Sequence, residues 1–383
     1  MALKVAGRGR VPPFIVMDVM RAANEREAAG GDVLHLEVGQ PGTPAPDGAL
    51  AAARAARDGH LIGYTDAMGL PSLRRRIARH YQDWYGCDLD PARVMVTTGS
   101  SAGFLLGFLA AFDAGDRVAL AAPGYPAYRN ILGALGVEPI LLPAEAEHRF
   151  QPTPELLDRL PKPPDGLIVA SPSNPAGTMV GRQEMQALVD YCHTHGIRLV
   201  SDEIYHGICF DQPGVSALEL TDDAIVINSF SKYFSMTGWR LGWMVLPEDL
   251  LRPAECLGQN LFISAPCLSQ IAGEAAFDCG EQLDGYVAAY ARNRALLLDE
   301  LPKAGLDRLA PADGAFYIYA DVSGLTNDSE AFCKRMLAEI GVAATPGIDF
   351  DPDRGRRFLR FSFAGREAAM AEAAHRLKGW IKG

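Results

Sequence analysis

The sequence predicts an α/β protein, with a large domain built on a mainly parallel central sheet between helices and a smaller α+β domain. Apolar runs of strand length recur without alternation, which is typical of strands covered on both faces. Stretches of helical length separate these runs, which is the order of βαβ units. The chain has 383 residues, more than one core usually supports, so we expect two domains.

The strands predicted for the large domain are rich in Val, Ile and Leu. They cover residues 94–98, 118–122, 139–142, 167–170, 198–201, 224–228 and 242–246. The stretches between them that we expect to be helical include residues 102–112, 125–135, 182–195 and 250–261. We therefore expect a large domain over residues 45–285.

The pattern changes after about Asp284, where strands become fewer and helices longer. We expect helices at residues 284–301, at 329–340 and from 367, with strands at 315–320 and 358–363. A helix at residues 14–29 is expected to pack on this part of the chain. The small domain would then comprise residues 1–44 and 286–383, with the N-terminal part forming an arm or lid.

Composition excludes several classes of partner. The net charge of −11 argues against nucleic acid, which needs clustered Lys and Arg. There is no apolar run of about 18 residues, so we expect no membrane span. The seven cysteines are scattered without a CxxC pair, which indicates a reduced, cytoplasmic protein. Cys192 and His193 are neighbours, but no ligand spacing surrounds them, so we expect no metal site.

Lys232 follows the predicted strand 224–228, in the sequence Ser229-Phe230-Ser231-Lys232. Open α/β sheets bind ligands at the carboxyl ends of their strands, and a partly deprotonated amine there can form an imine with an aldehyde. Arg240 follows eight residues later, and a guanidinium and serine hydroxyls can bind a phosphate. Considered alone, Lys232 is better explained as an ordinary exposed lysine than as a cofactor-binding one. Arg240, considered alone, is explained equally well by an ordinary ion pair and by phosphate binding.

Polar residues also end two neighbouring strands. Asp202 ends the run 198–201, and Tyr205 follows it. An acid there can keep a pyridinium nitrogen protonated, although a lone Asp is more often a helix N-cap. Asn174 lies in a Pro- and Gly-containing turn after strand 167–170, where its amide can donate to a phenolate oxygen. Taken singly, an Asn-Pro pair is explained by turn geometry.

A helix start and an aromatic residue complete the set. Gly99-Ser100-Ser101-Ala102 follows the first strand and opens an apolar helix, whose N–H groups and dipole attract a phosphate. Simple N-capping explains the same residues. Tyr125 follows strand 118–122 and can stack on a planar ring, or it can belong to the core.

Together these residues resemble the fold-type I pyridoxal 5′-phosphate (PLP)-dependent aminotransferases of class I/II, the aspartate aminotransferase superfamily. The features occur in the family's order, and residues 229–242 resemble the family's lysine motif nearly throughout. The similarity runs from about Leu36 to Ala364.

The resemblance implies that Lys232 holds PLP as an internal aldimine and then moves the proton between Cα and C4′. It implies that Asp202 pairs with the pyridine nitrogen, and that Asn174 and Tyr205 bond the phenolic oxygen. Tyr125 would stack on the ring. The phosphate would be bound by Ser229, Ser231, Arg240 and the helix start Gly99, Ser100, Ser101 and Ala102.

Further positions match the family. Arg360 resembles the arginine that binds the substrate α-carboxylate, and Gly39 resembles the glycine whose backbone lies against that carboxylate. We include Asn174 with these two as a substrate-binding residue. Tyr64 resembles the tyrosine that reaches the phosphate of the neighbouring subunit. The resemblance therefore implies a homodimer with shared active sites. Without it, Arg360 is explained as an arginine on a mixed strand.

The sequence gives less guidance on the substrate side chain. Some relatives specialised for dicarboxylic substrates have lysine where Ser100 stands, and no second arginine for a distal carboxylate is evident. The apolar stretch 14–20 would cover the site as a lid. These features favour neutral or aromatic amino donors, although an arginine from an unaligned loop would overturn that preference.

We therefore expect an aminotransferase of amino acid metabolism that moves the amino group between an L-amino acid and a 2-oxo acid by a ping-pong mechanism. One alternative is a PLP-dependent C–S β-lyase on the same scaffold, because fold does not fix chemistry. Another is a PLP-binding regulator. The acidic charge, and a fold that starts near residue 12, argue against an attached DNA-binding domain.

Overall fold

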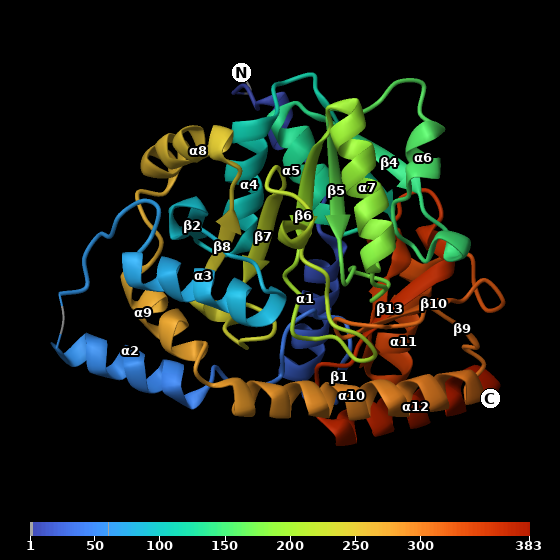
Figure 1. Ribbon diagram of the computed structural model, residues 1–383. Coiled ribbons are helices and arrows are strands. Elements are labelled where there is room, and N and C mark those ends of the chain that lie inside the picture. The colour runs from blue at the N-terminus through green and yellow to red at the C-terminus, as the bar shows by residue number, and fades with distance from the viewer. Residues whose placement is uncertain (1–2, 60) are drawn as a thin grey trace.

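The computed structural model describes residues 3–59 and 61–383. A seven-stranded sheet lies at its centre (Figure 1). The strand order is β2-β8-β7-β6-β5-β3-β4, and β8 is antiparallel to both of its neighbours while the other pairs are parallel. The predicted mainly parallel sheet is thus confirmed. Its strands are β2 (Val94–Thr97), β3 (Arg117–Ala122), β4 (Glu138–Pro143), β5 (Gly166–Ala170), β6 (Arg198–Asp202), β7 (Ile225–Ser229) and β8 (Gly242–Val245).

Helices cover both faces of this sheet, and side chains alternate between two apolar layers. Val94 and Val96 point to one layer with α3 (Pro71–Tyr85) and α7 (Arg182–His195), whereas Met95 points to the other. The second layer contains α4, α5 and α8. Burial on both faces explains why these strands are apolar throughout. The bounds of the second set are α4 (Ser100–Ala111), α5 (Pro126–Leu135) and α8 (Glu248–Leu261).

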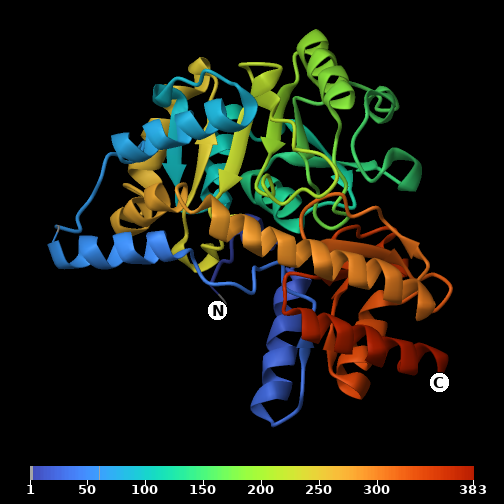
Figure 2. The same ribbon diagram turned by 60° about the horizontal axis from the view of Figure 1, so that its bottom comes forward.

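A second, four-stranded sheet of order β12-β13-β10-β9 is antiparallel and lies in the C-terminal part of the chain. The helix α10 (Gly280–Lys303) runs from the large sheet toward it and packs against α12, as Figure 2 shows. The elements are β9 (Arg308–Leu309), β10 (Tyr317–Asp321), α11 (Ser329–Ile340), β12 (Thr345–Pro346), β13 (Phe358–Ser362) and α12 (Glu367–Lys382).

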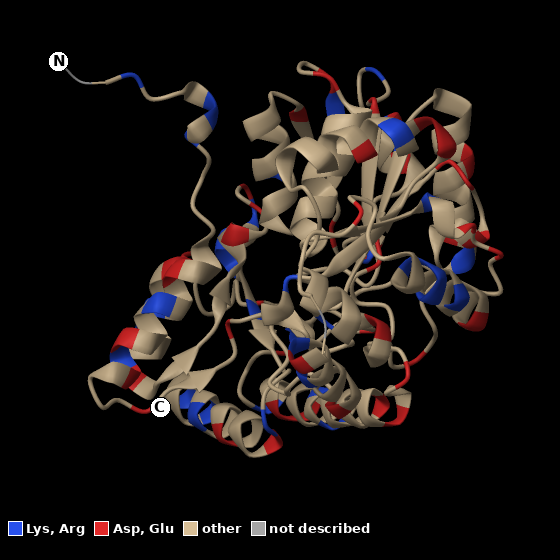
Figure 3. Ribbon diagram, turned by 90° about the vertical axis from the view of Figure 1, so that its left-hand side faces the viewer, with Lys and Arg blue, Asp and Glu red and all other residues tan. Residues whose placement is uncertain are grey.

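The N-terminal segment joins this second part. Strand β1 (Leu34–His35) pairs in parallel with β11 (Val342–Ala343), and α1 (Ile15–Ala28) lies against β11 and β12. The residues before α1 extend from it along the side of the large domain (Figure 3), where the turn Gly7–Gly9 contacts α5. The predicted domain boundaries remain a prediction.

Several short elements lie outside the predicted pattern. Helices α2 and α9 pack on each other, and alanine and other small residues make up most of their buried faces. In the part of the chain described, no helix has the length and apolar character needed to cross a bilayer. The remaining elements are α2 (Asp47–Gly59), α6 (Pro154–Asp158), α9 (Cys267–Ala276) and the 3-10 turns Gly7–Gly9, Pro91–Arg93, Ala146–His148, Ala217–Glu219, Thr237–Trp239, Gly347–Asp349 and Gly355–Arg357.

Candidate active site

The carboxyl ends of parallel strands β3, β5, β6 and β7 bring the predicted polar residues together. Tyr125, Asn174, Asp202 and Lys232 follow or end these strands, and all four line one cavity of about 520 Å³. Its other walls come from α1, from the segment around Gly39, and from β10 and β13 of the second sheet. The cavity therefore lies between the two sheets, where open α/β folds place their ligands.

The amine of Lys232 points into this cavity. Its Nζ donates a hydrogen bond to the Gly39 carbonyl at 2.6 Å. Burial, with the charges of Arg360 and Arg240 nearby, lowers the pKa of Lys232 to about 8, although Asp202 acts in the opposite direction. The uncharged amine that imine formation requires is thus much more populated near neutral pH than in an ordinary lysine.

Position 39 has room for glycine but not for a larger residue. A Cβ at this position would lie 2.0 Å from the Tyr317 hydroxyl oxygen. That hydroxyl is itself hydrogen-bonded to the Tyr205 hydroxyl at 2.7 Å. Tyr317 was not among the predicted site residues, although it lies within the predicted strand 315–320.

Asp202 is buried, with 3% of its surface exposed, and has two hydrogen-bond donors. The Ile204 N–H donates to Oδ1 at 3.1 Å, and the Tyr128 hydroxyl donates to Oδ2. Burial raises the pKa of Asp202 to about 6, and these two hydrogen bonds oppose the rise. Tyr128 was also missed; it follows Tyr125 by three residues, the spacing that places two side chains on one helix face.

Arg360 and Asn174 meet on the side of the cavity that faces the second sheet. Arg360 is 2% exposed, and its Nη1 donates to Asn174 Oδ1 at 2.9 Å. Its Nη2 donates to the Glu37 carbonyl and to Thr345 Oγ1. Its Nε has no hydrogen-bond partner among the described residues. A buried arginine that lines a cavity can bind a carboxylate there.

One end of the cavity can hold an anion. Ser100 and Ser101 begin α4 and line the cavity with Ser231 and Arg240. Gly99 has a φ of +78°, and a Cβ there would lie 2.5 Å from Arg240 Nη2, so the guanidinium packs against the start of the helix. A helix N-terminus beside an arginine is a suitable phosphate site.

The other predicted residues lie outside the cavity lining. Ser229 is buried beneath Ser231, to which its hydroxyl donates at 2.9 Å. Ala102 is buried in α4. Tyr64 is 84% exposed and is not among the residues that line this cavity.

The N-terminal stretch covers the cavity with apolar side chains. Phe14, Val16, Met17 and Met20 line it, and the Phe14 ring packs edge-on against Tyr125 at 5.7 Å between centroids. Among the described residues that line the cavity, the arginines are Arg240 and Arg360. The side of the cavity formed by the N-terminal stretch is therefore apolar.

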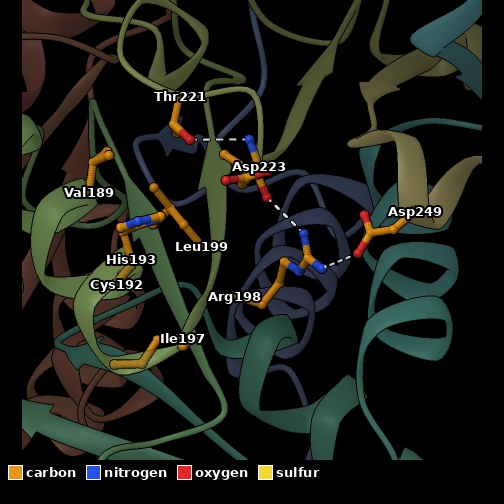
Figure 4. A pocket seen from close by; sticks show the side chains of 11 residues that line it. Val189, Cys192, His193, Ile197, Arg198, Leu199, Thr221, Asp223 and Asp249 are labelled. Carbon is orange, nitrogen blue, oxygen red and sulfur yellow. Dashed lines mark hydrogen bonds and ion pairs between the residues drawn. The ribbon is translucent and has the colours of Figure 1, made fainter.

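A separate hollow of about 270 Å³ lies at the opposite, amino-terminal ends of β6 and β7 (Figure 4). Its Arg198 donates to Asp249 at 2.5 Å and to the Asp223 carbonyl at 2.9 Å. The cation of Arg198 is therefore already paired within this hollow.

Comparison with known proteins decides the family. The family model described as aminotransferase class I and II matches residues 31–377. The chain belongs to this family. Proteins similar to this chain include the valine–pyruvate aminotransferase of Mycobacterium tuberculosis H37Rv, which is 51% identical over 99% of this chain and 98% of the relative. The (5-formylfuran-3-yl)methyl phosphate transaminase of Methanocaldococcus jannaschii is 32% identical over 96% of each chain.

Solved structures agree with this assignment. The crystal structure of an aminotransferase from Mycobacterium tuberculosis superposes with a TM-score of 0.98 at 50% identity, covering 100% of both chains. The chain is accordingly an aminotransferase that acts on an amino acid and a 2-oxo acid and uses PLP, as the sequence predicted. The C–S β-lyase alternative is not favoured by these relatives.

The cavity fits this cofactor. It offers an amine of lowered pKa for the aldehyde, a buried carboxyl group for the ring nitrogen, and an arginine beside a helix N-terminus for the phosphate. The close approach of Arg240 to Gly99 leaves room for no side chain at that end. These are the polar groups that PLP requires.

Proposed function

We propose that Lys232 attaches PLP in this cavity and that the remaining residues divide the cofactor between them. Asp202 pairs with the ring nitrogen, Asn174 and Tyr205 with the phenolic oxygen, and Tyr125 lies on the ring face. Ser100, Ser101, Ser231 and Arg240 bind the phosphate, with Gly99, Ala102 and Ser229 shaping their positions. The observation that carries the proposal is Lys232 Nζ, a half-buried amine of lowered pKa that faces the same cavity as Asp202.

We propose that Arg360 binds the α-carboxylate of the substrate, with Asn174 and the Gly39 backbone beside it. Arg360 lines the cavity, and its Nε has no hydrogen-bond partner among the described residues; both observations support this role. The substrate is then held with its Cα near Lys232, which fixes the reacting atoms before chemistry begins.

The bound cofactor supplies an aldehyde for the substrate amine and a ring that withdraws electrons from Cα. Once the substrate amine has replaced it, Lys232 Nζ is free to accept the Cα proton and to return a proton on the other side of the nitrogen. Asp202 keeps the ring nitrogen protonated. Return of the amino group to a second 2-oxo acid uses the same residues in reverse order.

We propose a neutral, apolar amino donor of L configuration, aliphatic like valine or aromatic. The apolar lining of Phe14, Val16, Met17 and Met20 supports this choice. The arginines among the described lining residues are Arg240 and Arg360, which we assign to the phosphate and the α-carboxylate, so neither is left for a distal carboxylate of the donor. The relative that is 51% identical is named a valine–pyruvate aminotransferase, which favours valine as donor and pyruvate as acceptor.

We also propose a homodimer with shared active sites, in which Tyr64 reaches the phosphate of the second copy. Tyr64 is 84% exposed, and apolar side chains near it in the chain are exposed as well, Leu61 at 94% and Ile62 at 44%. Burial of these side chains by a second copy would remove apolar surface from water. The separate sheets support the proposed division into residues 45–285 and residues 1–44 with 286–383. The scattered cysteines favour a cytoplasmic location.

One experiment tests the central proposal. Purified protein supplied with PLP should show the visible absorbance of a lysine-bound cofactor, and the band should shift when an amino acid is added. Lys232→Ala should lose both the band and turnover. A wild-type protein that stays colourless with added PLP would contradict the proposal. A donor panel with pyruvate and 2-oxoglutarate as acceptors then ranks valine, alanine, phenylalanine and aspartate.

A further inference from the structure

We propose that Asp349, a residue outside the cavity lining, is the anchor of the lid helix α1 and thereby a positioning residue for apolar substrates. This inference rests on the proposed function, because it assigns the preference for apolar donors to the position of α1. Asp349 ends the turn Gly347–Asp349, and it is 1% exposed.

Helix α1 has no N-terminal cap of its own. Phe14 occupies the N-cap position and makes no side-chain cap hydrogen bond. The Ile15 N–H donates to Asp349 Oδ1 and the Val16 N–H to Asp349 Oδ2, both at 3.1 Å. These N–H groups belong to the turn that lacks intrahelical partners, and a carboxylate is favourable at this positive end of a helix. Asp349 thus supplies the missing cap from 333 residues away along the chain.

The same segment holds the loop that carries Tyr125. Arg129 Nη2 donates to the Asp349 carbonyl at 2.6 Å, and the Gly124 N–H donates to the Phe350 carbonyl at 3.1 Å. The Phe350 ring lies 4.8 Å from the Arg360 guanidinium. Asp349 and Phe350 therefore connect the lid, the ring-facing loop and the carboxylate clamp.

The anchored turn supplies most of the α1 side chains that reach the cavity, and Met20 in the next turn supplies another. Phe14 packs on Tyr125, and Val16 and Met17 line the cavity in the turn that Asp349 caps. Without the cap this turn loses two hydrogen bonds and opens more often, because helix ends fray when their N–H groups have no partner. A donor with a large apolar side chain loses the surface on which it packs. Alanine as the amino donor has only a methyl side chain, so it loses little of this packing.

The test compares three variants by amide hydrogen exchange and by kinetics. Asp349→Ala removes both acceptors, and Asp349→Asn keeps one in a side chain of the same shape. The matched control is Asp328→Ala, because Asp328 caps α11 through the Ala331 N–H at 3.1 Å and lies away from the cavity. Exchange at residues 15–17 is measured without substrate, and KM and kcat are measured for valine and for alanine.

We expect Asp349→Ala to exchange faster at Ile15 and Val16, to raise the KM for valine about tenfold, and to change the KM for alanine less than about threefold. Its kcat should stay within about twofold of wild type, and Asp349→Asn should be intermediate. Asp328→Ala should lower the melting temperature and leave the ratio of the two KM values unchanged.

Equal changes of KM for valine and alanine, or unchanged exchange at Ile15 and Val16, would overturn the proposal. If Asp349→Ala does not fold, the isosteric Asp349→Asn decides by the same two measurements. A wild-type protein that transaminates no donor contradicts the proposed function instead, and the exchange comparison still confirms or overturns the anchor.

Discussion

The hydroxyl of Tyr128 donates a hydrogen bond to the buried carboxyl group of Asp202. Both side chains line the cavity, and Tyr128 is 4% exposed. The hydrogen bond stabilises the charged form of Asp202 against the burial that raises its pKa to about 6. Under the proposed function, Tyr128 thereby helps Asp202 to keep the negative charge that would face the ring nitrogen of PLP.

Replacing Tyr128 with Phe should therefore weaken catalysis most at low pH. Removal of the hydrogen bond raises the pKa of Asp202 further, so the carboxylate is lost at a higher pH as the pH falls. We expect kcat to drop about tenfold near pH 6 and less near pH 8. The measurement is the pH profile of kcat for both proteins.

A matched control is Tyr191→Phe, which removes a tyrosine–aspartate hydrogen bond of 2.9 Å to Asp158 at the surface. It should leave the profile unchanged. A profile for Tyr128→Phe that is lowered equally at every pH would show that Tyr128 acts by packing alone.

Glu203, next to Asp202, should make the free energy of unfolding depend on pH. It is 1% exposed, its Oε1 accepts from Ser216 and from the Ala217 N–H, and its Oε2 has no partner among the described residues. Burial raises the pKa of Glu203 from 4.5 to about 8, and burial lowers the pKa of His206 to about 4. Both groups are thus neutral at neutral pH, and their 3.7 Å contact is not an ion pair.

A raised folded-state pKa gives stability that is complete below the unfolded value and is lost as the pH rises through the folded value. Wild type should therefore lose stability relative to Glu203→Gln between pH 4.5 and about 8, by at most about 1.4 kcal/mol per pH unit. Urea unfolding at several pH values measures this difference. A difference that does not vary with pH would show that Glu203 is ionised in the folded protein. Glu281→Gln, an exposed change, is the control.

The sequence was most informative where chemistry follows a strand directly. Asp202 ends β6, and Lys232 comes three residues after β7, so the parallel topology alone brings them to one edge of the sheet. Apolar strands without alternation gave the large sheet for the same reason, because both of its faces are covered.

The missed residues depend on contacts between distant parts of the chain. Tyr205 and Tyr317 are 112 residues apart, and the cap of α1 by Asp349 spans 333 residues. No local pattern specifies which tyrosine or which aspartate makes such a contact, because it depends on how the two sheets face each other. Helices α2 and α9 were missed as well, and alanine and other small residues make up most of their buried faces.

Gly39→Ala should impair substrate binding through Tyr317. The new Cβ would lie 2.0 Å from the Tyr317 hydroxyl oxygen and 3.0 Å from the ring carbon that carries it. Tyr317 must move, although its ring also lies 4.4 Å from the Arg360 guanidinium. We expect the KM for the amino donor to rise at least about tenfold.

The double variant Gly39→Ala with Tyr317→Phe removes the oxygen that causes the clash. It should recover part of the lost affinity, beyond what Tyr317→Phe alone predicts. The interaction between the two changes is read from a double-mutant cycle in KM. Simple addition of the two effects would show that the clash does not account for the loss.

The exposed surface around Tyr64 should be an interface between two copies of the chain. Leu61→Glu places a charge on a side chain that is 94% exposed in the single chain, where it should cost little stability. If a second copy covers this surface, the charge would have to be buried in the dimer, so the variant should dissociate into monomers at concentrations where wild type is a dimer. Light scattering and sedimentation measure this.

Tyr64→Phe keeps the apolar ring and removes the hydroxyl, so it should remain dimeric and bind PLP more weakly, by about fivefold to tenfold. Leu325→Glu is the control, because Leu325 is 40% exposed and is distant in sequence from this surface. A Leu61→Glu protein that stays dimeric with full PLP affinity would mean that the second copy binds elsewhere and that Tyr64 belongs to neither active site.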